Sequence, residues 1–391
     1  TVLLFTLLVS VLAGAAVGVV PALRATSFSP WEQLKAVSRV SEGRSSSRMR
    51  NVLVVLQVAI SVVLLIGSGL LIQTMSRLAQ VNLGFDPDDL LAGSVGIRSS
   101  VYKTPQQRSS FFTTLVDQVE ALPGVVQASV VSKIPIASPY MDWLVWPAGQ
   151  PKPPSGERET ALARFAMPGY FETMGIPLIM GRDIEPSDTH DAGRVIVLSE
   201  AVAEGLFPGQ DPIGRMVNLE WNDPWEVVGI VGNARLDGVR AEGDWAMYMS
   251  SAQVGLNSGW LAVRAEGNPL MLSEPIRAIL HDMDRDVVFS NPMTMSAIVE
   301  ADLTSLRTVT TALELLAGIA LLLTAVGLYG VLAYHVNQRA GEFGIRIALG
   351  APVCELMAMV VTRSARMVGA GLVLGVAVSL LGNRLVQDLL F

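Results

Sequence analysis

Apolar residues are gathered in four long blocks, and a long region of mixed polar and apolar residues separates the second block from the third. The blocks cover residues 1–23, 51–76, 308–336 and 363–384. Each is about as long as the ~20-residue helix that crosses the ~30 Å hydrocarbon core of a bilayer. The last block reaches this length when the arginines at its ends extend toward the headgroups. The pattern therefore predicts four transmembrane helices.

The region between the second and third blocks, residues 77–307, has the pattern of a folded α+β domain. Strand-like runs at residues 90–98 and 125–132 flank a helix that begins after the N-cap residue Thr104 and ends near Leu122. Threonine followed by proline is a favourable start for a helix, because the hydroxyl can cap the first turn and proline needs no partner there. This order predicts a β-α-β unit.

The rest of this region predicts a β-rich subdomain inserted into the β-α-β unit. Residues 142–156 are rich in tryptophan and proline, and we expect them to form an irregular boundary. Short strands are then expected at residues 217–221, 225–232, 246–250 and 260–265. An amphipathic helix at residues 269–283 and a closing strand at residues 286–290 complete the domain. Residues 295–307 have a helical pattern that continues directly into the third apolar block.

The distribution of charge predicts which segments lie in the cytoplasm. Residues 24–50 hold six basic side chains against two acidic ones, and basic side chains also stand between the third and fourth blocks. Cytoplasmic segments of membrane proteins carry such an excess of lysine and arginine. We therefore expect residues 24–50 and 337–362 inside and residues 77–307 outside.

A short amphipathic helix is expected at residues 338–349, directly after the third block. Its charged residues alternate with apolar ones, and Glu342 stands four residues before Arg346, the favourable order for a helical ion pair. Gly350 and Pro352 then give a stop signal. The alternative is a solvated charged loop with no partner.

Small and polar residues inside the blocks predict helix packing. Gly14 with Gly18, and Gly371 with Gly375, form two GxxxG patterns, which let helix backbones approach closely in lipid. Ser61 lies one turn from Gln57, so these side chains either bond within their own helix or reach a neighbouring one. A further polar residue, Glu314, stands just inside the third block, either as a functional carboxylate or as a group held in the headgroup region.

Composition excludes several classes of protein. Of the 391 residues 51% are hydrophobic and only 16% are charged, too apolar for an ordinary soluble protein. The net charge of −7 and the lack of a basic patch argue against nucleic-acid binding. One cysteine and three scattered histidines give no basis for a disulfide framework or a metal site. The sequence contains no GxxxxGK[ST], HExxH or GxSxG, so we expect no catalytic residue, no metal and no cofactor of its own.

Three strings resemble a known family. AVGLYGVLAY at residues 325–334, followed by QRAGEFGIRIALGAP at 338–352, is similar to the signature of the permease subunits of MacB/FtsX-type ABC systems. Residues 165–184 and 195–215 resemble the extracytoplasmic core domain of these permeases. Residues 21–35 resemble the cytoplasmic tail that follows the last helix of a permease half.

The resemblance implies an architecture. In this family one half consists of one helix, a large outer domain and three further helices. The first block then ends a preceding half, and the final helix of the second half is expected beyond residue 391. The chain would be the back part of a duplicated permease, truncated at both ends, in a bacterial inner membrane that it crosses several times.

The resemblance also implies function and partners. ATP would be bound by a separate P-loop ATPase, and further partners would be the other permease half in a dimer or pseudo-dimer, a periplasmic adaptor and the lipid bilayer. The ATPase contact would consist of Arg339, Glu342, Phe343, Gly344, Arg346, Leu349 and Gly350. The chain would couple ATP hydrolysis to movement of the outer domain for export. The alternative is an FtsX-like scaffold that activates a cell-wall hydrolase, and a third possibility is a membrane-anchored enzyme.

Overall fold

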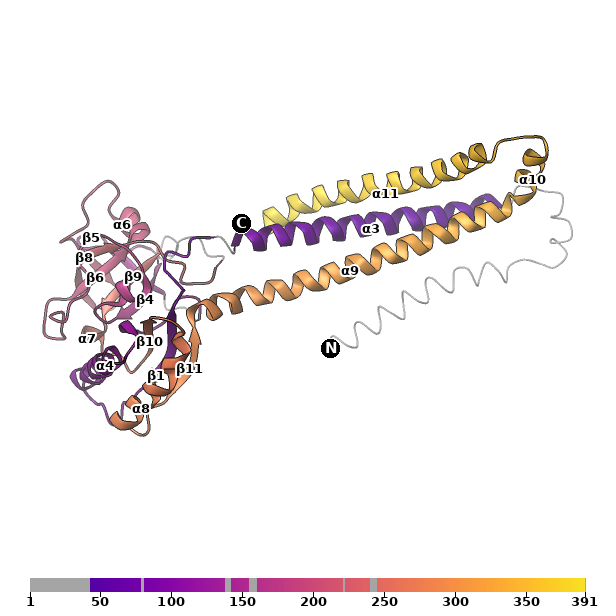
Figure 1. Cartoon of the computed structure of the whole chain (residues 1–391). Helices are drawn as coiled ribbons and strands as arrows, with labels where there is room; N and C mark the ends of the chain where they lie inside the picture. Colours follow the sequence, from indigo (N-terminus) through magenta and orange to yellow (C-terminus); the bar gives the residue numbers. More distant parts are fainter. Residues whose placement is uncertain are drawn as a thin grey trace. The chain divides into compact units, whose positions relative to one another are not determined.

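The computed structural model describes residues 43–78, 81–137, 142–154, 160–220, 222–239 and 245–390 (Figure 1). The chain divides into two compact units, one formed by residues Leu71–Thr311 and the other by the residues before and after them. The first apolar block, most of the basic linker, and with them Gly14 and Gly18, lie outside the described residues.

Eleven strands form one mixed sheet in the described part of Leu71–Thr311. Their order is β11-β1-β10-β2-β4-β3-β7-β8-β6-β9, and β5 pairs with β8 beside this path. The bounds are β1 Leu90–Gly96, β2 Val125–Val131, β3 Asp142–Pro147, β4 Thr160–Ala166, β5 Leu178–Gly181, β6 Val195–Ser199, β7 Met216–Leu219, β8 Asn222–Val231, β9 Ala246–Ser250, β10 Ser258–Ala265 and β11 Phe289–Thr294.

The expected β-α-β unit is confirmed, with one strand placed inside it. β1 and β2 both run antiparallel to β10, which lies between them, so they are parallel to each other. The connecting helix α4, Pro105–Glu120, packs on β2. The Thr104 hydroxyl accepts from the Gln107 N–H, and the Gln107 side chain accepts from the Thr104 N–H. This capping box satisfies two main-chain donors of the first turn.

The β-rich insertion is also confirmed, because β3 to β9 all lie between β2 and β10 in sequence. Its link to the first subdomain is narrow, since β2 and β4 pair only at Val131 and Ala166. Beyond this pair, β4 runs parallel to β9, and β6 runs parallel to β8.

Three local expectations need correction. Residues 142–147 form strand β3, paired with β4 and β7, where an irregular boundary was expected. The run Trp143–Trp146 is aromatic and β-branched, and this outweighs the prolines that follow it. The closing strand β11 begins at Phe289, not at residue 286, because Asp284 accepts from the main-chain N–H groups of Asp286 and Val287 and holds a turn there. The helix expected at 269–283 is a 3₁₀ turn, η2 (Pro269–Leu272), followed by α8 (Ser273–Met283).

The two faces of the sheet carry separate apolar clusters. On β9, Met247 and Met249 belong to one cluster, and Ala246 and Tyr248 belong to the other. Successive side chains of a strand point to opposite faces, so a strand such as β9 or β6 contributes to both clusters. α4, α6 (Glu200–Leu206) and α8 supply buried residues to the first cluster, and α5 (Tyr170–Met174) to the second. α7 (Ser251–Val254) follows β9.

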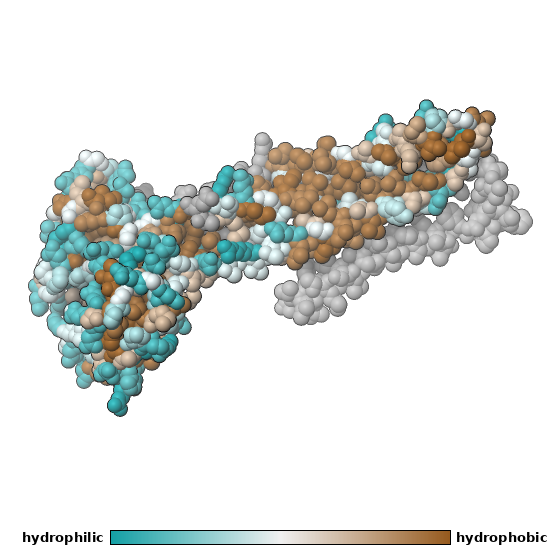
Figure 2. Space-filling model, in the orientation of Figure 1, coloured by the Kyte–Doolittle hydropathy of each residue, from teal (hydrophilic) through white to brown (hydrophobic). Residues whose placement is uncertain are grey.

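The other unit is helical. It contains α10 (Ala340–Ala348), α11 (Val353–Leu390) and the membrane-type parts of α3 (Gly43–Leu78) and α9 (Met295–Gln338). Three helices of the described chain are long and apolar enough to cross a membrane, over Asn51–Leu78, Met295–Asn337 and Val353–Gly382. Apolar residues cover most of their visible surface in Figure 2. α11 begins ten residues before the predicted block, because Pro352 starts the helix and no helix breaker stands between it and Arg363.

Candidate functional site

The short helix expected after the third block is present as α10, and it is closed at its C-terminal end. α9 ends at Gln338, Arg339 follows with φ −109° and ψ 11°, and α10 begins at Ala340. After α10, Gly350 has φ +90°. Its N–H donates to the carbonyl of Ile347 at 3.0 Å, and the next N–H donates to the carbonyl of Arg346 at 2.9 Å. This pair of bonds is the Schellman closure, for which glycine is the favoured residue.

The ion pair expected along α10 is formed. The Arg346 Nη2 lies 2.7 Å from Glu342 Oε1, four residues earlier. Both side chains are partly exposed, so the pair contributes only about 0.2–0.5 kcal/mol to helix stability. The two charges therefore remain accessible to a partner.

Phe343 is half-buried, whereas the other side chains of α10 are more exposed. On the rest of the helix and its C-cap, Ile345 is 65% exposed and Leu349 is 82% exposed. Gly344, another residue of the expected ATPase contact, has no neighbour within 4 Å of the place where a Cβ would stand. α10 is thus held on one side and open on the other.

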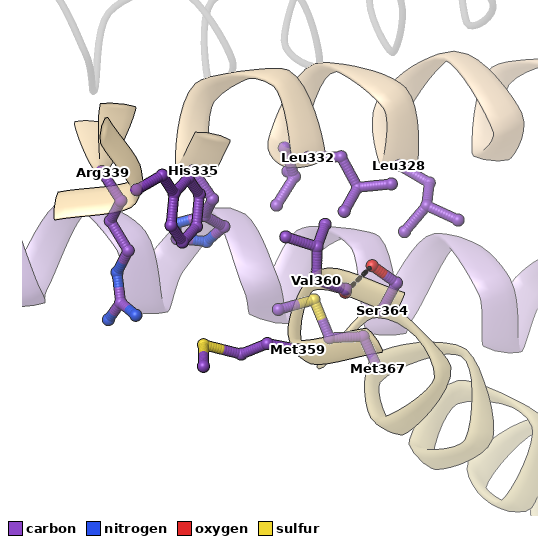
Figure 3. Close-up of a pocket in the computed structure, with 10 residues that line it drawn as sticks. Leu328, Leu332, His335, Arg339, Met359, Val360, Ser364 and Met367 are labelled. Atoms are coloured by element: carbon purple, nitrogen blue, oxygen red, sulfur yellow. Dashed lines mark hydrogen bonds between the residues drawn. The ribbon is translucent and has the colours of Figure 1, made fainter. Parts of the chain in front are cut away.

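Phe343 is one of the residues that line a mainly apolar groove formed by α9, α10 and α11. Figure 3 shows the groove with Leu328 and Leu332 on one side and Met359 and Met367 on the other. Its volume is about 40 Å³. Arg339 stands at the rim of this groove, near the end of α9, and the Ser364 hydroxyl is turned to its own helix, donating to the carbonyl of Val360 at 3.0 Å. The lining residues are Leu328, Val331, Leu332, His335, Arg339, Phe343, Met359, Val360, Ser364 and Met367.

The second GxxxG pattern lies where α11 meets α3. A Cβ on Gly371 would stand 2.6 Å from the Cβ of Val58 and 2.8 Å from the carbonyl oxygen of Val55. A Cβ on Gly375 would stand 2.8 Å from the carbonyl oxygen of Ala59. Only glycine allows backbones to approach this closely.

Ser61 of α3 bonds both within its own helix and to a neighbouring helix, the two possibilities that the sequence left open. The Ser61 hydroxyl donates to the Gln57 carbonyl in its own helix at 2.9 Å, and it lies 3.0 Å from the Thr324 hydroxyl of α9. Gln57 also faces α9, where its Oε1 lies 3.0 Å from the position of a Cβ on Gly327. Glu314 is exposed on α9.

Several acidic residues of the outer unit pair with basic side chains. Asp86 pairs with Arg264 at 3.2 Å and accepts from the N–H of Asp88. Asp188, which is buried, forms two bonds of 2.8 and 2.9 Å to the Arg182 guanidinium. In the described part of the chain no group of three or more histidine, cysteine or carboxylate residues could hold a metal ion.

One carboxyl group was not singled out from the sequence. The pKa of Asp183 is raised to about 6, mainly by burial and to a smaller degree by the nearby Glu172, while the main-chain N–H groups of Ile184 and Gly169 and the charge of Arg182 act to lower it. The group follows β5 in the string GRDI, and only its burial, which the sequence does not reveal, sets it apart. Its Oδ1 accepts from the main-chain N–H of Ile184, so it helps to hold the loop after β5.

The sequence is similar to two known domains. The MacB-like periplasmic core domain matches residues 52–271, and the FtsX-like permease C-terminal domain matches residues 314–391.

Curated relatives match at lower identity. The macrolide export ATP-binding/permease protein MacB of Neisseria meningitidis is 24% identical over 235 residues, covering 56% of this chain and 35% of the relative. The pyoverdine export ATP-binding/permease protein PvdT of Pseudomonas aeruginosa is 26% identical over 222 residues, covering 54% of this chain and 33% of the relative. The chain thus spans about a third of the length of the curated relatives it matches.

Solved structures of outer domains are also similar. The periplasmic region of MacB from Actinobacillus actinomycetemcomitans has 14% identity and a TM-score of 0.39, covering 57% of this chain and 97% of that one. The extracellular domain of the ABC-type transporter YknZ from Gram-positive bacteria has 16% identity and a TM-score of 0.35, covering 51% of this chain and 100% of that one. The outer-domain match covers more than half of the chain, and with the membrane helices and the C-terminal match it shows that this chain belongs to the MacB/FtsX-type ABC transporter permease family.

Proposed function

We propose that the chain is the membrane subunit of an export system in the bacterial inner membrane, and that α10 is the contact through which a separate P-loop ATPase acts on it. The proposal rests on the arrangement of α10: its Phe343 lines the groove formed with α9 and α11, and its other side chains are exposed to solvent. The matched relatives, which are named as export ATP-binding/permease proteins, support it.

A helix that receives force must be stiff and must pass the force on. α10 is closed by the bonds at Gly350, and the Arg339 N–H donates back to the Val336 carbonyl of α9 at 3.1 Å, so the link between the two helices is short. Phe343 contacts the groove formed by α9 and α11. A push on α10 is therefore delivered to both long helices.

α9 connects the end that adjoins α10 with the outer domain. It is one helix from Met295 to Gln338. Its first residues are anchored in the outer unit, where Met295 and Ile298 are buried in the apolar cluster and the Asp302 carboxylate accepts from the Val239 N–H at 3.0 Å. In the helical unit its Val331 packs against Val54 and Val58 of α3. The same helix thus has residues in the core of each unit.

Reversing the charge of Glu342 on α10 tests whether this helix contacts the ATPase. In the full-length protein, Glu342→Lys loses the ion pair with Arg346, which is worth only about 0.2–0.5 kcal/mol, so insertion and abundance should not change. A like charge at a partner interface costs several kcal/mol, so ATPase association and export should fall about tenfold or more. Both are measured by co-purification with the ATPase and by export assay.

Two controls make the test specific. The exposed Glu300 of α9, in the outer unit, has the same charge, and Glu300→Lys should leave ATPase association unchanged. The double variant Glu342→Lys/Arg346→Glu restores a pair within the helix but reverses its direction, and it should remain defective. Normal ATPase binding and export in Glu342→Lys would show that α10 is a solvated segment. Binding of a cell-wall hydrolase with no effect on export would favour the scaffold function instead.

A further inference from the structure

A polar hollow adjoins the apolar groove under Phe343 and shares Arg339 and Met359 with it. Its volume is about 520 Å³, within the range of small-ligand pockets, ~300–1,000 Å³. Its lining consists of Arg339, Glu355, Ala358, Met359, Thr362 and Arg366. Two arginines and one glutamate thus line the hollow, and its formal net charge is positive.

The two arginines stand at matching places in the sequence. Arg339 follows an uncharged stretch that ends α9, and Arg366 precedes the uncharged stretch of α11 at residues 367–383. Long basic side chains at the ends of such uncharged stretches extend toward lipid headgroups. Both guanidinium groups are without an ion-pair partner among the described residues. Arg346, in contrast, is paired with Glu342 on the same surface.

The groove and the hollow differ in character. The groove is lined mainly by leucine, valine and methionine side chains of α9 and α11, together with His335, Arg339, Phe343 and Ser364. Its volume of about 40 Å³ admits only the beginning of a hydrocarbon chain. The hollow offers two cations and the Thr362 side chain, although the hydroxyl itself donates to the carbonyl of Ala358 at 2.7 Å. An anionic headgroup attached to a hydrocarbon chain fits both halves, whereas a free anion would use only one.

We propose that Arg339 and Arg366 hold the phosphate of an anionic phospholipid in this hollow, with the start of an acyl chain in the groove beside Phe343. The lipid would fill the space between α9 and α11 next to α10 and so stiffen the support of this helix. Arg339 then acts mainly toward the lipid, while Glu342 and Arg346 remain exposed for a protein partner.

The test uses the full chain in neutral detergent with no ATPase present, so its outcome is independent of the coupling role of α10. Binding of added phosphatidylglycerol and phosphatidylcholine is measured by native mass spectrometry. We expect a preference for phosphatidylglycerol. Since a basic residue at an anionic surface is worth ~1 kcal/mol, Arg339→Gln/Arg366→Gln should weaken phosphatidylglycerol binding roughly ten- to thirtyfold.

The control variants separate a built site from general charge. Arg346→Gln removes one positive charge from the same region and should change binding less than about twofold, because its charge is already paired with Glu342. Arg366→Lys keeps the charge and should retain most of the binding. Equal binding of the two lipids by the unaltered chain, or unchanged binding in the double variant, would overturn the proposal. Displacement of the lipid by excess inorganic phosphate would do so as well, because it would show a site for free anions.

Discussion

The main-chain N–H of Ala351 donates to the carbonyl oxygen of Arg346 across 2.9 Å, and this bond closes α10. It forms because Gly350 adopts φ +90°, which costs a residue with a Cβ about 1–2 kcal/mol. We therefore expect Gly350→Ala to loosen the end of α10 and to increase protease cleavage near Arg346 in the full-length protein. Gly341→Ala is the control, because Gly341 has a negative φ and open space around it, and it should not increase cleavage.

Residues 71–311 contain two apolar clusters and a continuous sheet of their own. A segment of this size is within the usual range for a domain that folds alone. We expect the purified segment to unfold cooperatively in water, measured by circular dichroism on heating. A gradual change without a transition would mean that the membrane helices must hold its two ends.

The buried carboxyl group of Asp183 should make this unfolding depend on pH. Its pKa is about 6 in the folded protein, above the ordinary 3.8, so the folded state binds more protons than the unfolded state between about pH 4 and 6. The contribution of Asp183 to stability is therefore present at low pH and is lost as the pH rises through about 6. Asp183→Asn removes this dependence.

The measurement is the difference in Tm between the original segment and Asp183→Asn at pH 5 and at pH 7.5. We expect the variant to gain a few degrees relative to the original on going to pH 7.5, since about 1 kcal/mol corresponds to roughly 2–4 °C for a unit of this size. Asp191→Asn, at an exposed position, should show no such gain. A constant difference across pH would contradict the raised pKa.

Helix packing at Gly371 gives a prediction for the helical unit. Gly371→Ala would place a methyl group 2.6 Å from the Cβ of Val58, and we expect a loss of about 1–3 kcal/mol, as for other overpacked sites. The thermal midpoint of the full chain in detergent should fall. Gly369→Ala, two residues away with open space around it, should be neutral or slightly stabilising. Equal midpoints for the two variants would exclude close packing of α11 on α3.

The topology can be tested by cysteine labelling in a Cys354→Ser background. We expect Asp191→Cys, in the outer domain, to react with a membrane-impermeant reagent in intact cells with an opened outer membrane. Ser46→Cys, in the basic linker, should react only after the inner membrane is permeabilised. Labelling of both positions in intact cells would contradict the predicted sidedness.

Local signals in the sequence determined the membrane helices, the start of α4 and the end of α10. A long uncharged stretch, a Thr104-Pro105 pair and a glycine at position 350 act through solvation or through bonds to near neighbours, so no distant residue is needed to interpret them. The family signature likewise consists of contiguous strings and could be identified from the sequence.

Tertiary structure decided which residues meet across long separations. The sequence did not show that β10 would lie between β1 and β2, or that β3 would be a strand, because pairing depends on partners far along the chain. The sequence also did not show that α10 contacts the groove through Phe343, or that Arg339 and Arg366 line one hollow. The sequence of one helix determines how its side chains are distributed around the helix axis. Which of these side chains contacts another helix is determined only by how α9 and α11 pack.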